Sequence, residues 1–511
     1  REFPEAIAQY SAALDICKNT LDEEDPLTLE CLKDYGAALS FSEDTAKEAE
    51  ECLRGALTRC LHVFGEKHPI TLEVMHYLAS SISDITEAEA LYKRALAGRE
   101  AVLGRDHPET LMTLNNFGGI LHQKGDLDAS IDAYRRAYIT KVEVRGITHP
   151  STLVSLTNLV STLAQKGELD EAEVFGRKVL DGYEENFGVE HPLTLEACSS
   201  LASVLVEKEE FDEAEMLYRR ELAGLEMEKG PDDLATLKAC HHLADVLDDK
   251  GLIEESELLF RRALAGLEKI KGIDHSETLY ICSRLAWVLV KNGSLDEAEI
   301  LYRRRLAGLE RDEGLDSSST LYICSRLADV LAKKGSLDEA EAFYRRELQG
   351  LEKTKGAEHS ETLQSCYNLA RVLAQKECFE EAEILYRREL AGLEKGDEQD
   401  KISALQTKIQ LADVLEQKEF YDDAEDLYRE ALAGYESTKG LDDPSTLQTC
   451  YSLATVLAKK GSLDEAEKLY RRELSGIEKE KGPDHPSTLQ TCYSLASLLF
   501  KKGNLDEAEK L

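Results

Sequence analysis

The sequence predicts an all-α fold, an α-solenoid in which antiparallel helical hairpins stack one on the next. Three observations predict it: the dipeptide Thr-Leu recurs along the chain, the apolar residues after it follow a helical period, and glycines recur where helical runs should end. From Thr110 to Thr488 the step is 42 residues, with Ala404 replacing one threonine, and the two earlier steps are 43 and 39 residues. Such a period indicates a repeat protein.

The first helix of each repeat is predicted from its apolar face. Counted from the threonine as zero, offsets 1, 4, 7, 8 and 11 are mostly apolar, as in Leu201 and Ala202 at offsets 7 and 8. These positions share one side of a helix. A turn such as Lys166-Gly167 then ends the helix, because glycine tolerates a left-handed backbone.

The second helix of each repeat is typified by residues 463–474. It starts with acids and carries an arginine pair further on, which complements the helix dipole. Glu and Arg four residues apart, each pair contributing ~0.2–0.5 kcal/mol, are found in Glu215/Arg219, Glu299/Arg303, Glu341/Arg345 and Glu467/Arg471. The remaining acids of this helix are interpreted as a solvated outer face.

One continuous solenoid over residues 1–511 is expected, because a single hairpin cannot bury its apolar face but stacked neighbours can. Residues 1–20 should be an orphan second helix, and the last repeat is truncated at Leu511. About twelve repeats should start near residues 28, 71, 110, 152, 194, 236, 278, 320, 362, 404, 446 and 488.

The composition excludes several classes of protein. With 100 acidic and 62 basic residues the formal charge is −38, which disfavours nucleic acid and anionic membranes as partners. No stretch approaches the ~18–20 apolar residues of a membrane-spanning helix. The twelve cysteines contain no C-x-x-C pair and favour a reducing intracellular compartment, the cytoplasm first. Because the chain opens at Arg1 without a methionine, we expect the intact protein to be longer. A targeting segment could then precede Arg1, so location in an organelle stays an alternative.

No residue pattern predicts catalysis, a cofactor or a metal site. The cysteines at offset 4 (Cys198, Cys240, Cys282, Cys324, Cys366, Cys450 and Cys492) are interpreted as small apolar fillers. Equivalent helices should lie ~8–10 Å apart, too far for disulfides. The adjacent His241 and His242 make a poor metal pair, and histidines that precede proline at helix starts (His68, His107, His149, His191 and His485) should cap or pack the loop. The tyrosines at offset 24 should be core.

The repeat resembles a known family at specific positions. Leu-Ala at offsets 7 and 8, Ala at 20, Tyr at 24 and frequent Ala at 27 resemble the tetratricopeptide repeat signature. The 42-residue period, His-Pro before the first helix and Tyr-Arg-Arg-x-Leu in the second are similar to the long variant of kinesin light chains and of the repeat arrays of some signalling ATPases. The resemblance implies a right-handed superhelix, a concave groove lined by the first helices, and protein partners.

The same resemblance implies that offsets 2, 5, 9, 12 and 13 of the first helices face the groove. Candidate partner-binding residues are then Tyr280, Trp287, Lys291, Tyr322, Lys333, Tyr367, Arg371, Tyr451, Lys459, Tyr493 and Lys501. Aromatic and basic side chains of this kind favour acidic or aromatic peptide segments, and the alternative is a variable, solvated face. Asp245, Asp248 and Asp249 should reverse the sign of the groove in their repeat.

Three functions stay open from the sequence. The favoured one is a non-enzymatic interaction scaffold or adaptor that binds partner segments in the groove. The second is a structural subunit of a large assembly, docked through its rims or ends. The third is the repeat arm of a larger regulatory protein such as a signalling ATPase.

Overall fold

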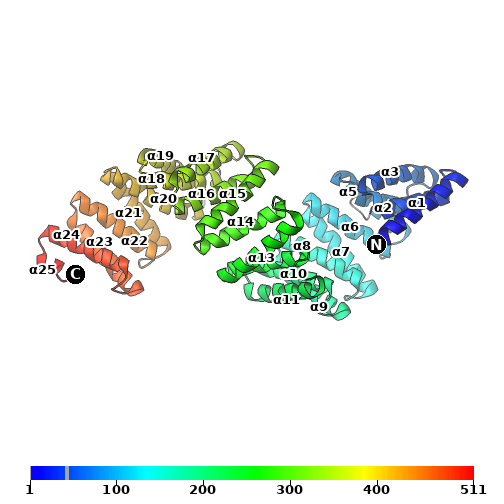
Figure 1. The fold of residues 1–511 in the computed structure, drawn as a ribbon, viewed down its shortest axis with the longest axis horizontal. Coiled ribbons are helices and arrows are strands. Elements are labelled where there is room, and N and C mark those ends of the chain that lie inside the picture. The colour runs from blue at the N-terminus through cyan, green and yellow to red at the C-terminus, as the bar shows by residue number, and fades with distance from the viewer. Residues whose placement is uncertain (1, 41–44, 397) are drawn as a thin grey trace. The chain divides into compact units, whose positions relative to one another are not determined.

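The computed structural model describes residues 2–40, 45–396 and 398–511, which form 25 α-helices and no strand (Figure 1). Two compact units make up the chain, Arg1–Gly266 and Leu267–Leu511, and their division falls within α13 (Ile253–Lys271). The all-helical fold of stacked hairpins predicted from the repeat is confirmed.

The first unit holds twelve helices before α13. They are α1 (Glu2–Thr20), α2 (Pro26–Leu39), α3 (Ala46–Val63), α4 (Pro69–Ser81), α5 (Ile85–Val102), α6 (Pro108–Lys124), α7 (Leu127–Arg145), α8 (Pro150–Lys166), α9 (Leu169–Phe187), α10 (Pro192–Glu207), α11 (Phe211–Lys229) and α12 (Leu234–Asp249).

The second unit holds twelve helices after α13. They are α14 (Ser276–Lys291), α15 (Leu295–Asp312), α16 (Ser318–Lys333), α17 (Leu337–Thr354), α18 (Ser360–Gln375), α19 (Phe379–Leu393), α20 (Glu398–Gln417), α21 (Tyr421–Thr438), α22 (Pro444–Lys460), α23 (Leu463–Lys481), α24 (Pro486–Lys502) and α25 (Leu505–Ala508).

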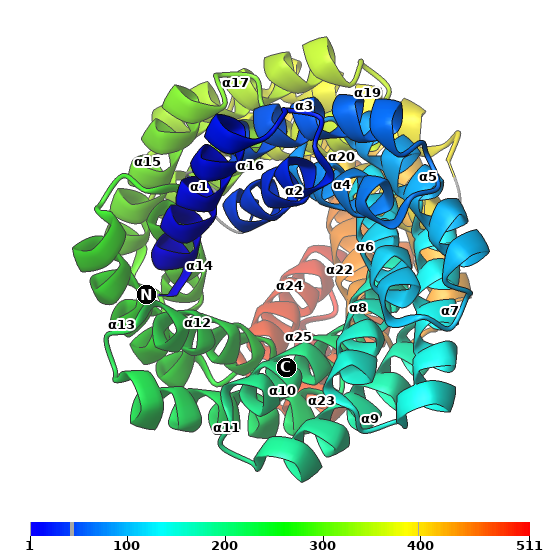
Figure 2. The ribbon, with the colours of Figure 1, turned by 90° about the vertical axis from the view of Figure 1, so that its right-hand side faces the viewer.

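Each helix packs against the next from α1 to α12 and again from α14 to α25. Even-numbered helices are the first helices of the repeats, and odd-numbered helices are the second helices. In the first unit α7, α9 and α11 lie outside α6, α8 and α10, and in the second α15 and α17 lie outside α14 and α16 (Figure 2). Within each unit the first helices therefore line the inner side.

The predicted histidine caps are present at the starts of first helices. Nδ1 of each histidine accepts the backbone N–H two residues further on, at 3.1–3.3 Å, for His68, His107, His149, His191 and His485. The proline that follows occupies the first helical turn, where its missing N–H costs nothing. At the other end of α8, Gly167 adopts φ 84°, the left-handed conformation that the Lys-Gly turn predicted.

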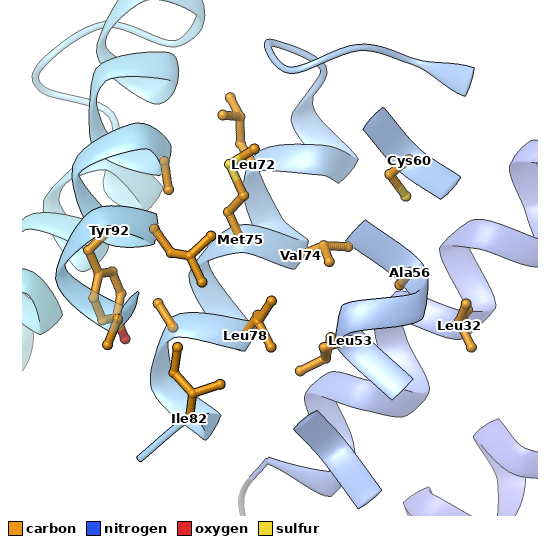
Figure 3. Close-up of a cluster of buried hydrophobic side chains, with 14 of the residues drawn as sticks. Leu32, Leu53, Ala56, Cys60, Leu72, Val74, Met75, Leu78, Ile82 and Tyr92 are labelled. Atoms are coloured by element: carbon orange, nitrogen blue, oxygen red, sulfur yellow. The ribbon is translucent and has the colours of Figure 1, made fainter. Parts of the chain in front are cut away.

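The core is made where second helices pack on first helices. In Figure 3, Leu53, Ala56 and Cys60 of α3 lie beside Val74 and Leu78 of α4, and all five are almost fully buried. A buried leucine or valine contributes ~1.5–3 kcal/mol relative to an exposed one. The repeated apolar offsets therefore supply the main cohesion between neighbouring helices.

Close helix approach also depends on glycine in the second helix. A Cβ at Gly308 in α15 would lie 2.2 Å from Leu279 Cδ1 of α14, so a larger residue there would force this leucine side chain to move. Leu279 stands at offset 1 of its repeat, which explains why leucine follows the recurrent threonine. The same fit between leucine and glycine occurs in α9, α11, α13, α17, α19, α21 and α23.

The cysteine and tyrosine columns lie in the core, as the sequence predicted. Cys198, Cys240, Cys282, Cys324, Cys366 and Cys450 are free and fully buried, and Cys492 is partly exposed. Burial raises the pKa of the Cys282 thiol to about 11, so it stays a neutral filler at physiological pH. The tyrosines are buried at the same point of successive second helices: Tyr92, Tyr134, Tyr218, Tyr302, Tyr344, Tyr386, Tyr428 and Tyr470.

The acids of the second helices are less free than the sequence suggested. Arg177 of α9 binds Glu173 of its own helix at 2.8 Å and also Glu213 of α11 at 2.6 Å. Lys208, before α11, binds the other Glu173 oxygen at 2.5 Å. The second arginine of each Arg-Arg pair binds a glutamate of the preceding second helix, as Arg220 of α11 binds Glu184 of α9 at 2.6 Å. Outer-face acids are thus tied into ion pairs between successive repeats as well as within helices.

The described part of the chain contains no helix that is both long enough and apolar enough to cross a bilayer.

Candidate partner-binding surface

The exposed side of the first helices α14 and α16 gathers aromatic and cationic side chains. Residues 42 apart are equivalent, so Tyr280 and Tyr322 form one column and Lys291 and Lys333 another. The tyrosines are 43% and 57% exposed, and both lysines are exposed. We call this surface the aromatic–cationic face and define it by Tyr280, Trp287, Lys291, Tyr322, Arg326 and Lys333.

Arg326 links the aromatic rings at the centre of the aromatic–cationic face. Its guanidinium carbon lies 5.8 Å from the Trp287 ring centroid and 5.1 Å from that of Tyr322. Lys291 Nζ lies 5.2 Å from the Trp287 centroid. Contacts of this kind contribute about 0.5–1 kcal/mol at exposed sites. They hold the rings in place on the helix surface.

Arg326 is absent from the residues predicted from the sequence, because it stands at offset 6. The sequence nevertheless contains a pattern that could have pointed to Arg326. The run Leu-Tyr-Ile-Cys-Ser-Arg-Leu-Ala occurs identically at 279–286 and 321–328. It places a tyrosine and an arginine four residues apart, where side chains are neighbours on a helix surface.

Arg371 of α18, a predicted binding residue, is engaged inside the molecule. The buried Tyr344 hydroxyl donates to Asp329 Oδ1 at 2.5 Å, and Arg371 donates to the same oxygen at 3.1 Å. Arg326 lies 3.7 Å from the other Asp329 oxygen. Burial and the Asp329 charge raise the pKa of Tyr344, so its hydroxyl remains a donor. Arg371 is therefore a positioning residue for Asp329, directly beside the aromatic–cationic face.

Tyr367, also predicted to bind a partner, is half-buried on α18. Its ring lies 5.7 Å from that of Tyr386, edge to face, and burial raises its pKa. Such pairs contribute about 0.5–1.5 kcal/mol beyond the area that they bury. Tyr367 serves the packing of α18 on α19 and leaves only part of its ring at the surface.

The candidates nearer the C-terminus divide into two kinds. Tyr451 of α22 packs on Tyr470 at 5.5 Å and accepts a hydrogen bond from Gln490 at 3.2 Å, and Lys459 binds Glu416 at 2.7 Å. Tyr493 and Lys501 of α24 are exposed. Exposure does not by itself mark a binding surface.

The predicted acidic groove on α12 is only partly present. Asp248 is 3% exposed and does not lie on the open surface. Asp245 lies 3.2 Å from His241 Nε2. The expectation that three acids reverse the sign of the groove here is therefore wrong for Asp248, because α12 turns this position toward its neighbours.

Among the described residues no cluster of three or more His, Cys, Asp or Glu side chains could hold a metal ion. The surface chemistry that the second unit offers is that of recognition: flat rings, fixed cations and a nearby carboxylate already bound by Tyr344 and Arg371.

Comparison with known families gives one match. The model of the tetratricopeptide repeat family matches residues 82–138, 151–227, 193–269, 317–395, 403–472 and 449–511, more than half of the chain. The comparison with curated proteins gives no match.

Three solved structures illustrate the similarity of fold. One is the Signal Transduction ATPase with Numerous Domains (STAND) protein with a tetratricopeptide repeat sensor from Pyrococcus horikoshii, with TM-score 0.54, 16% identity, and coverage of 92% of this chain and 71% of that one. The apo form of RapI has TM-score 0.53 and 15% identity, over 73% and 98%. A kinesin light chain candidate from Podosopora anserina with nearly identical TPR-like repeats has TM-score 0.37 and 20% identity, over 39% and 96%. The first two share the fold with this chain, and the third aligns too loosely to support a conclusion.

Proposed function

Because this chain belongs to the tetratricopeptide repeat family, whose domains generally serve as protein-interaction modules, we propose that it is a non-enzymatic scaffold that binds acidic segments of partner proteins on the aromatic–cationic face. The observation that carries the proposal is the Trp287–Arg326–Tyr322 stack, with Arg326 between two rings at 5.8 and 5.1 Å. Tryptophan, tyrosine and arginine are the residues that most often dominate protein-binding surfaces.

The charges of the aromatic–cationic face favour an acidic partner. Lys291 and Arg326 lie over the Trp287 ring, Arg326 also lies over the exposed Tyr322 ring, and Lys333 is exposed on the same helix as Tyr322. A carboxylate that reaches Arg326 or Lys291 would form a charge-assisted hydrogen bond while its neighbours cover the rings. The formal charge of −38 opposes approach from a distance, but ions screen remote charges beyond ~8 Å at physiological salt. The local cations therefore decide binding.

The test is co-purification from an extract followed by mass spectrometry, with wild type compared with the double variant Trp287→Ala/Arg326→Glu. We expect the variant to lose the acidic partners that wild type recovers. Two matched controls change the second-helix side instead: Ile300→Ala on α15 removes exposed apolar area, and Lys479→Glu on α23 reverses an exposed charge. Both should retain the partners.

Equal recovery by wild type and the double variant would refute the proposal. Loss of partners in the two controls together with crosslinks to second helices would instead favour a structural subunit docked through its outer surface.

A further inference from the structure

A pocket of about 400 Å³ lies between α6, α7 and α8 in the first unit. Leu111, Met112 and Val154 supply apolar walls, and Asn115, Lys141 and Arg145 supply polar groups. Glu109 also lines the pocket, but its carboxylate is paired with Arg99 at 3.6 Å. Its size and mixed lining are those of a small-molecule site, in which a few polar groups orient a mostly apolar ligand. None of these residues belongs to the aromatic–cationic face.

The two cations in the pocket have no acidic partner among the described ion pairs. Lys141 is 7% exposed, and its Nζ donates to the Ser151 carbonyl at 3.1 Å and to Ser155 Oγ at 2.7 Å. Arg145, one helical turn further along α7, donates to Ser151 Oγ at 3.1 Å. Buried charges are normally paired, because removing a charge from water is costly. Here two cations donate only to neutral groups of Ser151 and Ser155, while the one acid in the lining, Glu109, is paired with Arg99 instead.

The preceding repeat shows the same arrangement with its charge balanced. Arg99 occupies the place of Lys141, and its guanidinium lies 3.6 Å from the Glu109 carboxylate. Thr113 occupies the place of Ser155 and accepts from Arg99 at 2.6 Å. One repeat later, Ser151 replaces the glutamate, and Arg145 replaces Leu103. The second copy has thus lost its negative charge and gained a positive one.

Packing does not require a cation at this position. The equivalent residues of most later repeats are apolar: Leu225, Leu309, Leu351, Leu393 and Ile477. All five are buried in their helices. A buried lysine with no carboxylate is therefore a departure that the fold itself does not explain.

We propose that this pocket binds a small organic oxyanion, a carboxylate or a phosphate monoester on an apolar body, with its negative oxygens between Lys141 and Arg145. The anion takes the place that the Glu109 carboxylate fills one repeat earlier. Lys141 keeps one N–H beyond the two it donates, and Arg145 keeps most of its five. Asn115 accepts the Ser155 hydroxyl through Oδ1 at 2.8 Å, which leaves its amide group as a further donor. Met112 and Val154 cover the apolar body.

The electrostatics agree with an anion at this place. Burial, and then the neighbouring Arg145 charge, lower the pKa of Lys141 to about 8. Lys141 is still mainly protonated at neutral pH. Ser151 lies in the first turn of α8, where the positive end of the helix dipole adds to the field of the two cations.

The experiment is calorimetric titration of the full chain with two probes, phenylacetate and phenyl phosphate, and with benzyl alcohol as the neutral analogue. Wild type should bind at least one oxyanion and not the alcohol. Tighter binding of phenylacetate identifies a carboxylate ligand, and tighter binding of phenyl phosphate identifies a phosphate ligand. The variants are Lys141→Leu and Arg145→Leu, which install the residue type of other repeats, and Ser151→Glu, which installs the acid of the preceding one.

Each leucine variant should weaken binding about tenfold to a hundredfold, the usual effect of one hydrogen bond to a charged group. Ser151→Glu should abolish binding and raise the melting temperature, which separates occupation of the pocket from misfolding. Trp287→Ala/Arg326→Glu should bind the probes as wild type does. The proposal is overturned if neither oxyanion binds at millimolar concentration, or if Ser151→Glu binds as tightly as wild type.

Discussion

The two sides of the same repeats use charge in opposite ways. On the second helices α15 and α17, Arg303 and Arg345 each bind a glutamate of their own helix and one of the next second helix. On the first helices α14 and α16, Lys291 and Arg326 lie over aromatic rings. Charge on the outer side joins successive repeats, whereas on the inner side cations stack on aromatic rings.

Tyr344 should give the largest effect, because it connects the two sides of the repeat. It belongs to the second helix α17, and its hydroxyl donates to Asp329 beside the aromatic–cationic face. Tyr344→Ala should cost about 3–5 kcal/mol in the free energy of unfolding, since a fully buried ring is lost. Urea denaturation of the full chain measures it. Tyr344→Phe is the matched control: it removes only the hydrogen bond to the Asp329 carboxylate and should cost about 1.5–3 kcal/mol. Equal losses would mean that the ring does not stabilise the hairpin.

Three consecutive residues of α19 show the same contrast between outward-facing, paired charges and an inward-facing group. Arg387 and Arg388 point outward and are paired, whereas Glu389 is 4% exposed and one of its oxygens lacks a hydrogen-bond partner. Burial raises the pKa of Glu389 to about 8. The titratable or polar groups that face it are neutral from pH 5 to 8: Cys366, Tyr367, Tyr386 and Thr407.

The sign of the effect follows from the raised pKa. Unfolded Glu389 loses its proton near pH 4.5 and folded Glu389 only near pH 8, so the folded state binds more protons between these values and stability falls as pH rises through them. Glu389→Gln should remove this loss and stabilise the chain at pH 9 by on the order of 2–4 kcal/mol, with little change at pH 4. Thermal unfolding at both pH values measures it. Parallel pH profiles for wild type and variant would contradict the burial of Glu389.

The sequence predicts the features that recur in every 42-residue repeat. Helix order, histidine caps and the buried columns of cysteine and tyrosine follow from local periodicity. The link between Asp329, Tyr344 and Arg371 does not, because it joins residues 15 and 42 apart. Glu389 is another example: it follows two arginines on a charged stretch, and only the packed neighbours show that it faces inward. Relations between helices depend on side-chain direction and on packing, which an offset alone does not give.

Arg371 tests the difference between positioning and binding. Arg371→Ala should destabilise the chain by about 1–2 kcal/mol, because it removes a hydrogen bond to a charged, half-buried group. It should also weaken partner binding, since Asp329 then adds negative charge beside Arg326. Arg371→Lys keeps the charge and should restore most of the affinity. Loss of affinity in both variants, with stability unchanged, would show that Arg371 contacts the partner directly.

Arg345 on the outer side should give the smallest effect. Arg345→Ala removes two ion pairs, with Glu341 at 2.7 Å and with Glu381 at 2.6 Å, but its side chain is 44% exposed and water solvates both charges. Exposed pairs contribute about 0.2–1 kcal/mol, and salt reduces this further. The expected loss of stability is therefore below about 1 kcal/mol at low salt and close to zero in 1 M salt, as measured by urea denaturation, with partner binding unchanged. A larger loss that persists in salt would mean that Arg345 stabilises the chain through the packing of its aliphatic stem along α17. The ion pairs between successive second helices would then follow from that packing and would not be its cause.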